Sequence, residues 1–177
     1  GPVPSGVTVD AQIVYYDVNA MSLGEMRQAL ASAGPQAQGR RWAAITTWRL
    51  SWTYRVAGTA TECEIREPQV RVATSITFPR WSPAGQPDTT LAAWWDQLNA
   101  GLSQHEKGHA RLAVAAGGRI VKALDGMSGG PCDALRTRAD DAARALSREM
   151  QLAQQNYDVT TRHGQVQILQ ATRLQTP

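Results

Sequence analysis

A single apolar stripe between Leu91 and Ala116 constrains the fold of this chain more than any other feature. Its members recur at alternating spacings of four and three residues, the period of one face of an α-helix. They are Leu91, Trp95, Leu98, Leu102, His105, His109, Leu112 and Ala116. Asp88 can cap this helix after a linker rich in proline and glycine, and the helix is expected to continue towards Leu124. The sequence therefore predicts a long helix with two histidines at positions where its buried face calls for leucine.

Stretches in the first half of the chain have the composition of β-strands, with β-branched and aromatic side chains or with bulky side chains at alternate positions. These stretches cover residues 7–18, 42–56 and 70–78, the last expected to end at Pro79. After the first of them, Ser22 and Glu25 match a capping box, which predicts a short helix to about Ala33.

A glycine-rich turn over 125–131 is expected to reverse the chain after the long helix. The inner face of a second helix is then predicted from Leu135 to Tyr157. We therefore expect an α+β fold, in which an antiparallel sheet in the N-terminal half packs on the long helix and on a second helix antiparallel to it.

Length and composition narrow the class of protein. The chain has 177 residues, 42% of them hydrophobic and 19% charged, which suits one globular domain over 1–177, mainly β over 7–80 and mainly α over 88–177. It has no run of 18 apolar residues, so no membrane span is expected. The net charge is only +3 and no basic run alternates with aromatic residues, which disfavours a nucleic-acid partner. The sequence does not indicate an oligomeric state.

The long helix carries His105-Glu106-Lys107-Gly108-His109, the pattern HExxH. Histidines at positions i and i+4 lie on one helix face, and both can bind one zinc ion at about 2.0–2.1 Å. Glu106 is rotated by about 100° from His105, so it can take a proton from a metal-bound water without binding the metal. The alternative is an ordinary helix with two buried, hydrogen-bonded histidines, since a pattern this short also arises by chance.

A third zinc ligand has two candidates in the residues alone. Catalytic zinc usually has three protein ligands and one open position. Glu149 lies level with the histidine pair if the second helix runs antiparallel to the first. His163 reaches the pair only if the chain folds back after Tyr157. Both candidates remain open at this point.

The two cysteines, Cys63 and Cys132, lack the spacing of a metal site. They are either buried thiols or one disulfide that closes a long loop, and the disulfide is favoured. A disulfide would indicate an oxidising compartment. The start of the chain, Gly1 to Pro4, is typical of a tag-cleavage remnant before a mature N-terminus, so we expect the signal peptide to be absent from this sequence.

The combination of HEKGH, a helical hairpin and the later segment YDVTTRHGQVQ resembles the DUF922 family of predicted secreted zinc-dependent proteases, whose pattern pairs HExxH with YDxxTxHG. The strand from Trp48 to Tyr54 with a following Cys63, the strand ending in FPRW and Cys132 after the first helix fit the same layout. The resemblance extends over most of residues 10–167.

This resemblance implies a role for each residue of the candidate site. The zinc ligands would be His105, His109 and His163, with Glu106 as the general base. Asp158 would orient a ligand imidazole, and Tyr157 would donate a hydrogen bond to a developing oxyanion. The plain alternatives are a turn or cap residue for Asp158 and the last core residue of its helix for Tyr157. The resemblance also supports a Cys63–Cys132 disulfide and a bacterial secreted or periplasmic location.

The sequence therefore predicts a zincin-like metallopeptidase that contains Zn²⁺ and cleaves peptide or protein substrates. An exposed strand edge could align an extended peptide. The first alternative is a secreted binding or scaffold module whose zinc is structural or vestigial. The second is an amide hydrolase that acts on cell-wall peptides.

Overall fold

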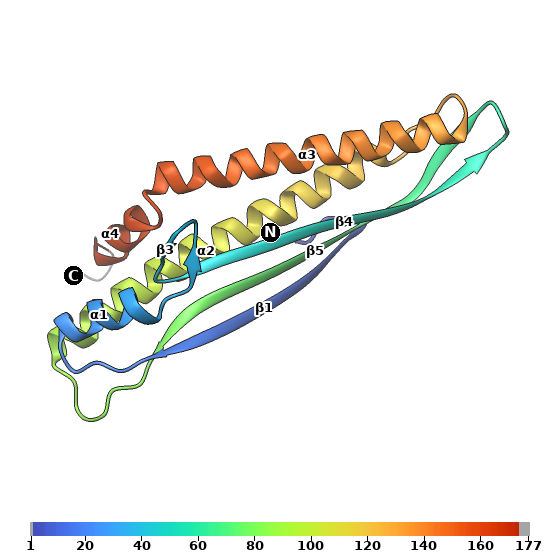
Figure 1. Ribbon diagram of the computed structural model, residues 1–177. Helices are drawn as coiled ribbons and strands as arrows, with labels where there is room; N and C mark the ends of the chain where they lie inside the picture. Colours follow the sequence, from blue (N-terminus) through green and yellow to red (C-terminus); the bar gives the residue numbers. More distant parts are fainter. Residues whose placement is uncertain (1, 174–177) are drawn as a thin grey trace. The chain divides into compact units, whose positions relative to one another are not determined.

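The computed structural model describes residues 2–173, which form a mixed α+β fold (Figure 1). The fold class is therefore confirmed at the level of a sheet in the N-terminal half followed by helices. The elements are β1 (Val7–Val18), α1 (Leu23–Ala33), β2 (Gln36–Ala37), β3 (Arg40–Arg41), β4 (Ile45–Gly58), β5 (Cys63–Trp81), α2 (Thr89–Leu124), α3 (Cys132–Thr161) and α4 (Gln165–Arg173). Among the described residues, no helix is long and apolar enough to cross a membrane.

The predicted helices are present. Ser22 caps α1, where its side chain accepts a hydrogen bond from the backbone of Glu25. The apolar stripe lies on α2, whose 36 residues continue through the glycine pair at 117–118. The helix α3 extends beyond the prediction at both ends. Residues 36–41 form the short antiparallel hairpin of β2 and β3, which the sequence did not predict.

The three long strands form a sheet in the order β1-β5-β4 (Figure 1). A short turn joins β4 to β5, and contacts such as Arg55 to Glu67 show these strands to be antiparallel. Along β1 and β5, by contrast, residue numbers rise together: Val70 donates to Gly6, and Ser82 donates to Val18. The prediction of a wholly antiparallel sheet is therefore wrong for β1. Alternating side chains specify a strand but not its direction. After α1 the chain returns as β4, which runs opposite to β1, and the turn into β5 then restores the direction of β1.

Pro79 does not end β5, which continues to Trp81. A proline removes one backbone donor from the ladder, but it does not prevent the extended conformation of its neighbours. The prediction that this strand ends at Pro79 is therefore wrong by two residues.

The chain forms two compact units. The first, called here the disulfide unit, comprises residues 2–11, 48–74 and 110–156 of the described chain. The second, called the histidine unit, comprises residues 12–47, 75–109 and 157–173. The elements β1, β4, β5, α2 and α3 each contribute residues to both units.

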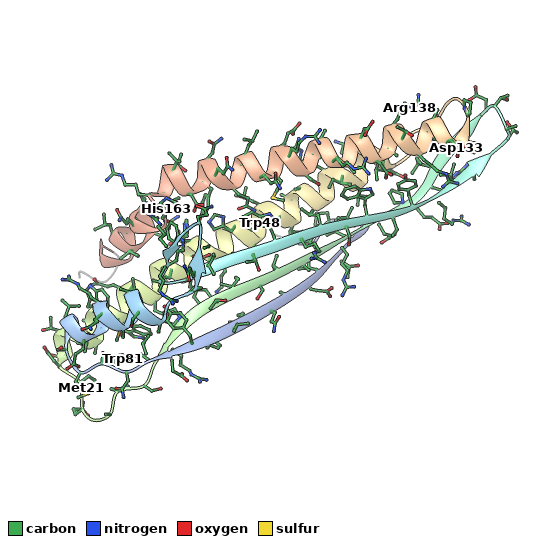
Figure 2. All side chains as sticks on the ribbon, in the orientation of Figure 1. Met21, Trp48, Trp81, Asp133, Arg138 and His163 are labelled. Atoms are coloured by element: carbon green, nitrogen blue, oxygen red, sulfur yellow. A yellow bond between two sulfur atoms is a disulfide. The ribbon has the colours of Figure 1, made fainter. Side chains whose placement is uncertain are left out.

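The disulfide unit has an apolar core between β5, α2 and α3. Its buried members are Cys63, Ile65, Val70, Val72, Ala113, Ile120, Leu124, Leu135, Ala139 and Ala143. Gly117 lets α2 approach the sheet, because a Cβ atom there would lie 2.9 Å from a methyl group of Val72. Arg138 near the start of α3 donates to the carbonyls of Ser128 and Gly129 in the preceding turn (Figure 2). Side-chain packing on one face of each element therefore defines this unit.

The predicted disulfide between Cys63 and Cys132 is present in this unit and joins β5 to the first residue of α3. Trp52 and Tyr54 of β4 both donate to Asp140 of α3. The aromatic face of β4 thus contacts α3 inside the disulfide unit.

The histidine unit buries apolar residues of α1, β5 and the first part of α2. They include Met26, Leu30, Ile76, Phe78, Leu91, Leu98 and Leu102. The helix α4 lies directly against α2, because a Cβ atom at Gly101 would lie 2.5 Å from the Cα of Ile168. Trp81 and Trp95 pack against each other as a tilted ring pair. This packing holds the start of α2, which leads into the two histidines.

Candidate metal centre

His105 and His109 lie one turn apart on α2, and both are buried, with 3% and 5% of their surfaces exposed. Asp158 approaches them from the last turns of α3. The Nε2 atoms of the two histidines are 3.2 Å apart. The Oδ1 atom of Asp158 lies 3.0 Å from Nε2 of His109 and 3.3 Å from Nε2 of His105. Three potential ligand atoms from two helices therefore meet at one point.

These separations suit a single zinc ion. Ligand atoms at two corners of a tetrahedron with bonds of about 2.0–2.1 Å lie about 3.3 Å apart. Two imidazole nitrogens and a carboxylate oxygen are also donors that zinc accepts. His105, His109 and Asp158 form a group whose ligand atoms all lie within 4.8 Å of one another, in the part of the chain that the structure describes. The residues present fit the metal in both distance and chemistry.

The electrostatics of Asp158 also call for positive charge at this point. Partial burial alone would raise its pKa, but hydrogen bonds and charge interactions with His105 and His109 outweigh burial and hold the pKa well below its ordinary value. Both kinds of interaction stabilise the carboxylate in its charged form. A bound cation at the centre would do the same.

Glu106 is buried beside the histidine pair, with 4% of its surface exposed. The hydroxyl of Thr46, on β4, lies 2.7 Å from its Oε2 atom and 3.1 Å from its backbone oxygen. Burial raises the pKa of Glu106, while the hydrogen bond from Thr46 and the nearby histidines lower it. A carboxylate with a raised pKa, held in one orientation, is suited to accept and return a proton.

Tyr157 supports both histidine rings. Its ring stacks on His105 with centroids 5.1 Å apart and meets His109 edge-on at 5.0 Å. Its hydroxyl accepts a hydrogen bond from Gln167 at 3.1 Å. A Cβ atom at Gly108 would lie 2.1 Å from the same hydroxyl oxygen, so this glycine admits the tyrosine against α2. The glycine inside HExxH therefore has a packing reason.

The chain folds back after α3, as a ligand role for His163 requires. Arg162, His163 and Gly164 all have positive φ angles, between 51° and 86°. This left-handed conformation is unfavourable for the two residues that are not glycine. The turn brings Gly164 against the ring of His105, where a Cβ atom would lie 3.2 Å from Cγ. Figure 2 labels His163 at this turn.

His163 lies beside the three ligand atoms but is not one of the group. Its Nδ1 is 3.6 Å from Oδ1 of Asp158, and 44% of its side chain is exposed. Its ring packs on Trp42 as a tilted pair, with centroids 4.7 Å apart. The guanidinium of Arg40 lies over the Trp42 ring, 3.5 Å from its centroid. Glu149, the other candidate, belongs to the disulfide unit and pairs there with Arg119.

Residues that the sequence did not single out complete the centre: Thr46, Thr161, Gly164, Gln167 and Trp42. Thr161 lies 3.2 Å from Nδ1 of His105. Thr161 and Gly164 are part of the YDxxTxHG pattern, so the pattern itself was a signal for them. Thr46 carried no signal, because a threonine is ordinary in a strand.

The fold and this centre define a mixed α+β protein with a candidate metal site between a histidine pair on α2 and the end of α3. The DUF922 family, described as a bacterial protein of unknown function, matches residues 13–164. The chain therefore belongs to the DUF922 family. Neither a curated protein nor a solved structure matches it.

Proposed function

We propose that this protein is a zinc-dependent peptidase of zincin-like design, and that residues 1–177 form its metallopeptidase domain. One observation carries the proposal: three ligand atoms meet at distances suited to zinc, with the buried Glu106 directly beside them. A buried, hydrogen-bonded histidine pair in an ordinary helix would account for the carboxylate, but it requires no buried glutamate beside it. Secretion to an oxidising compartment, outside the cell or in the periplasm, is part of the same proposal and is supported by the disulfide.

We assign zinc binding to His105 and His109, with a third ligand from the segment after Asn156. Asp158 has the supporting geometry, since its Oδ1 lies within 3.3 Å of both imidazole nitrogens. The resemblance implies His163, whose Nδ1 is 3.6 Å from that oxygen. With Asp158 as the third ligand, the fourth position is open to water. With His163 as well, protein ligands fill the site.

Zinc bound here supplies a Lewis acid that lowers the pKa of a coordinated water towards about 7 and polarises a carbonyl group. The chain supplies the proton transfers. Glu106 accepts the proton of the attacking water and returns it to the nitrogen of the leaving amine, which balances the hydrolysis of the peptide bond. Thr46 holds one oxygen of Glu106, so the carboxylate keeps one orientation through both transfers.

Tyr157 is proposed as the donor to the oxygen that becomes negative during attack. Its ring position against His105 supports a place in the centre, while its hydroxyl already accepts from Gln167. A Tyr157→Phe variant separates the roles: loss of turnover with zinc affinity intact indicates catalysis, and loss of both indicates packing.

The test of the proposed function is Glu106→Gln, which keeps the size of the side chain and removes its basicity. We expect hydrolysis of a denatured protein substrate to fall by about 10²–10⁴-fold, the usual contribution of general base catalysis. Zinc content should stay near one per chain, because Glu106 is not a ligand. Glu149→Gln is the matched control and should retain both zinc and activity, because Glu149 is exposed and pairs with Arg119. Full activity in the Glu106→Gln variant would disprove the mechanism.

A secreted scaffold module with a structural zinc is the second candidate, and the position of His163 favours it. A ring nitrogen 3.6 Å from the carboxylate oxygen can close the fourth coordination position. Absorption spectra of the Co²⁺-substituted protein distinguish the two candidates, because an exchangeable water responds to added azide and a closed site does not. A cell-wall amide hydrolase would use the same chemistry, and assays on peptidoglycan peptides beside protein substrates separate it from a peptidase.

A further inference from the structure

We infer, resting on the proposed zinc site, that Thr161 is a positioning residue that fixes the tautomer of the His105 ring. By holding the proton on Nδ1, it leaves Nε2 as an electron-pair donor at the point where the ligand atoms meet. Thr161 does not touch the metal position itself. Thr161 acts through His105, whose Nδ1 atom lies 3.2 Å from the hydroxyl oxygen of Thr161.

The hydrogen-bond directions at Thr161 follow from its chemistry. A threonine hydroxyl has one hydrogen and two lone pairs. The Oγ1 atom lies 2.6 Å from the carbonyl oxygen of Tyr157, one helical turn earlier, and a carbonyl oxygen can only accept. The hydroxyl hydrogen is therefore used there, since the carbonyl of Asp158 is much farther away at 3.5 Å. Towards Nδ1 of His105 the hydroxyl oxygen must accept, so Nδ1 carries a hydrogen.

The consequence appears on the other side of the ring. A neutral imidazole has one N–H group, so a hydrogen on Nδ1 leaves a lone pair on Nε2. That lone pair faces the Asp158 carboxylate oxygen at 3.3 Å. Two electron-pair donors at this distance repel each other unless a cation lies between them. The hydrogen bond to Thr161 thus leaves both His105 and Asp158 with electron pairs that one cation can bind.

Burial makes this arrangement selective. Thr161 and His105 expose only 9% and 3% of their surfaces, so water has little access to replace the bond between them. The opposite tautomer would set the lone pair of Nδ1 against the lone pairs of the hydroxyl, inside a site that offers few other partners.

A simpler explanation is that Thr161 only bonds back to the preceding turn, as threonines in helices often do. Thr160 provides the comparison. Its hydroxyl also bonds to the carbonyl of Tyr157, at 3.1 Å, but Thr160 is exposed. If back-bonding were the whole role, changes at Thr160 and Thr161 would have similar effects on metal binding.

The experiment compares zinc dissociation constants of Thr161→Val, Thr161→Ser and Thr160→Val with that of the wild type, measured by competition with a chromogenic chelator. Valine keeps the shape of threonine and removes the hydroxyl. We expect Thr161→Val to weaken zinc binding by about 10–100-fold, the range for losing an outer hydrogen bond to a ligand histidine. Thr161→Ser should restore most of the affinity, and Thr160→Val should match the wild type.

A second measurement needs no metal. In ¹⁵N-labelled, metal-free wild-type protein at about pH 8, where an ordinary imidazole is neutral, the His105 ring should show the hydrogen on Nδ1. Thr161→Val should lose this preference, and far-UV circular dichroism shows whether that variant folds. A wild-type ring with its hydrogen on Nε2 would overturn the inference even if no variant folds.

The outcomes for the two proposals are distinct. Equal zinc affinity in wild type and in a folded Thr161→Val variant would overturn the role of Thr161 and leave the proposed function intact. A wild type that binds no zinc would remove the proposed function, and the tautomer measurement would still decide whether Thr161 positions the ring.

Discussion

The two halves of α2 lie in different units, and only the half in the histidine unit buries polar side chains beside its apolar ones. In the disulfide unit, the buried face of α2 carries Ala113, Ile120 and Leu124. In the histidine unit, the same helix buries His105, Glu106 and His109. Apolar side chains gain free energy simply by leaving water, whereas buried polar groups cost free energy unless each finds a partner. Packing thus explains the apolar side chains of both halves, whereas the buried polar side chains of the histidine unit are explained only by their partners.

Each unit also links parts of the chain that are far apart in sequence, but by different means. The disulfide unit joins Cys63 to Cys132 with a covalent bond. The histidine unit brings Asp158 to the histidine pair of α2, where we propose a zinc ion as the link. The comparison teaches that the same structural need, closing a long loop, is met by a covalent bond in one unit and by the proposed zinc centre in the other.

The largest expected effect is a loss of zinc affinity that occurs for substitutions in the histidine unit and not for those in the disulfide unit. If Asp158 is a ligand, Asp158→Ala should abolish zinc binding or weaken it by more than about 100-fold, the upper end of the effect expected for an outer hydrogen bond. His163→Ala should weaken it as strongly if His163 is also a ligand, and only slightly if His163 merely packs on Trp42. Metal content per chain and chelator competition measure both variants.

The control for this comparison is Asp140→Ala in the disulfide unit. Asp140 accepts bonds from Trp52 and Tyr54, so its loss should reduce stability without changing zinc affinity. Equal zinc loss in the Asp140 and Asp158 variants would break the distinction between the two units. Retention of zinc in Asp158→Ala together with loss in His163→Ala would assign the third ligand to His163.

The sequence predicts the buried face of a helix better than the direction of a strand, for a physical reason. A periodic apolar stripe directly encodes the buried face of α2, so its extent was predictable. Strand direction was not, because alternation is the same in parallel and antiparallel strands. This is why the parallel pairing of β1 with β5 was missed.

The details of the centre depend on long-range contacts that no local pattern carries. Thr46 and Glu106 are 60 residues apart, and nothing near Thr46 indicates that its hydroxyl would meet a glutamate. The turn at 162–164 depends on positive φ angles at two residues other than glycine, which composition does not suggest. The sequence singled out the histidine pair and Asp158, whereas it carried no signal for the bond between Thr46 and Glu106 or for the conformation of this turn.

The next effect concerns the covalent link. Replacing Cys63 and Cys132 together by serine should lower the free energy of unfolding by about 2–5 kcal/mol, since the bond closes a loop with a sequence separation of 69. Amide hydrogen exchange should rise first in residues 110–156, while zinc affinity stays unchanged. Parallel loss of zinc and stability would show instead that the two units unfold together.

Two glycines of α2 give a smaller and more local comparison. Alanine at either position gains about 1 kcal/mol of helix propensity but adds a methyl group to a tight contact. At Gly108 that contact is the hydroxyl of Tyr157, and at Gly117 it is a methyl group of Val72. Gly108→Ala should therefore displace Tyr157 from His105 and weaken zinc binding. Gly117→Ala should change only the melting temperature, and a zinc effect at Gly117 would contradict the separation of roles.

The smallest effect is a pH dependence that should differ between the units. In the histidine unit, Tyr16 donates to the carbonyl of Ala43 at 2.7 Å, and burial raises its pKa to about 12. Folding thus favours the neutral phenol. Its contribution to the free energy of unfolding is complete below about pH 10 and is lost as the pH rises from about 10 towards 12. Burial and a bond to Asp140 also raise the pKa of Tyr54 in the disulfide unit, where the side chain is partly buried against the apolar core.

Urea unfolding midpoints across this alkaline range test the difference. Tyr16→Phe should lower stability by about 0.5–1.5 kcal/mol at neutral pH, because one hydrogen bond is lost, and should flatten the decline above pH 10. Tyr54→Phe should flatten it less, because the phenol of Tyr54 is less deeply buried than that of Tyr16 and so ionises in the folded chain at a lower cost. An equal or larger change in slope for Tyr54→Phe would mean that alkaline unfolding begins in the disulfide unit. Burial of Tyr16 would then not be the cause of the loss of stability at high pH.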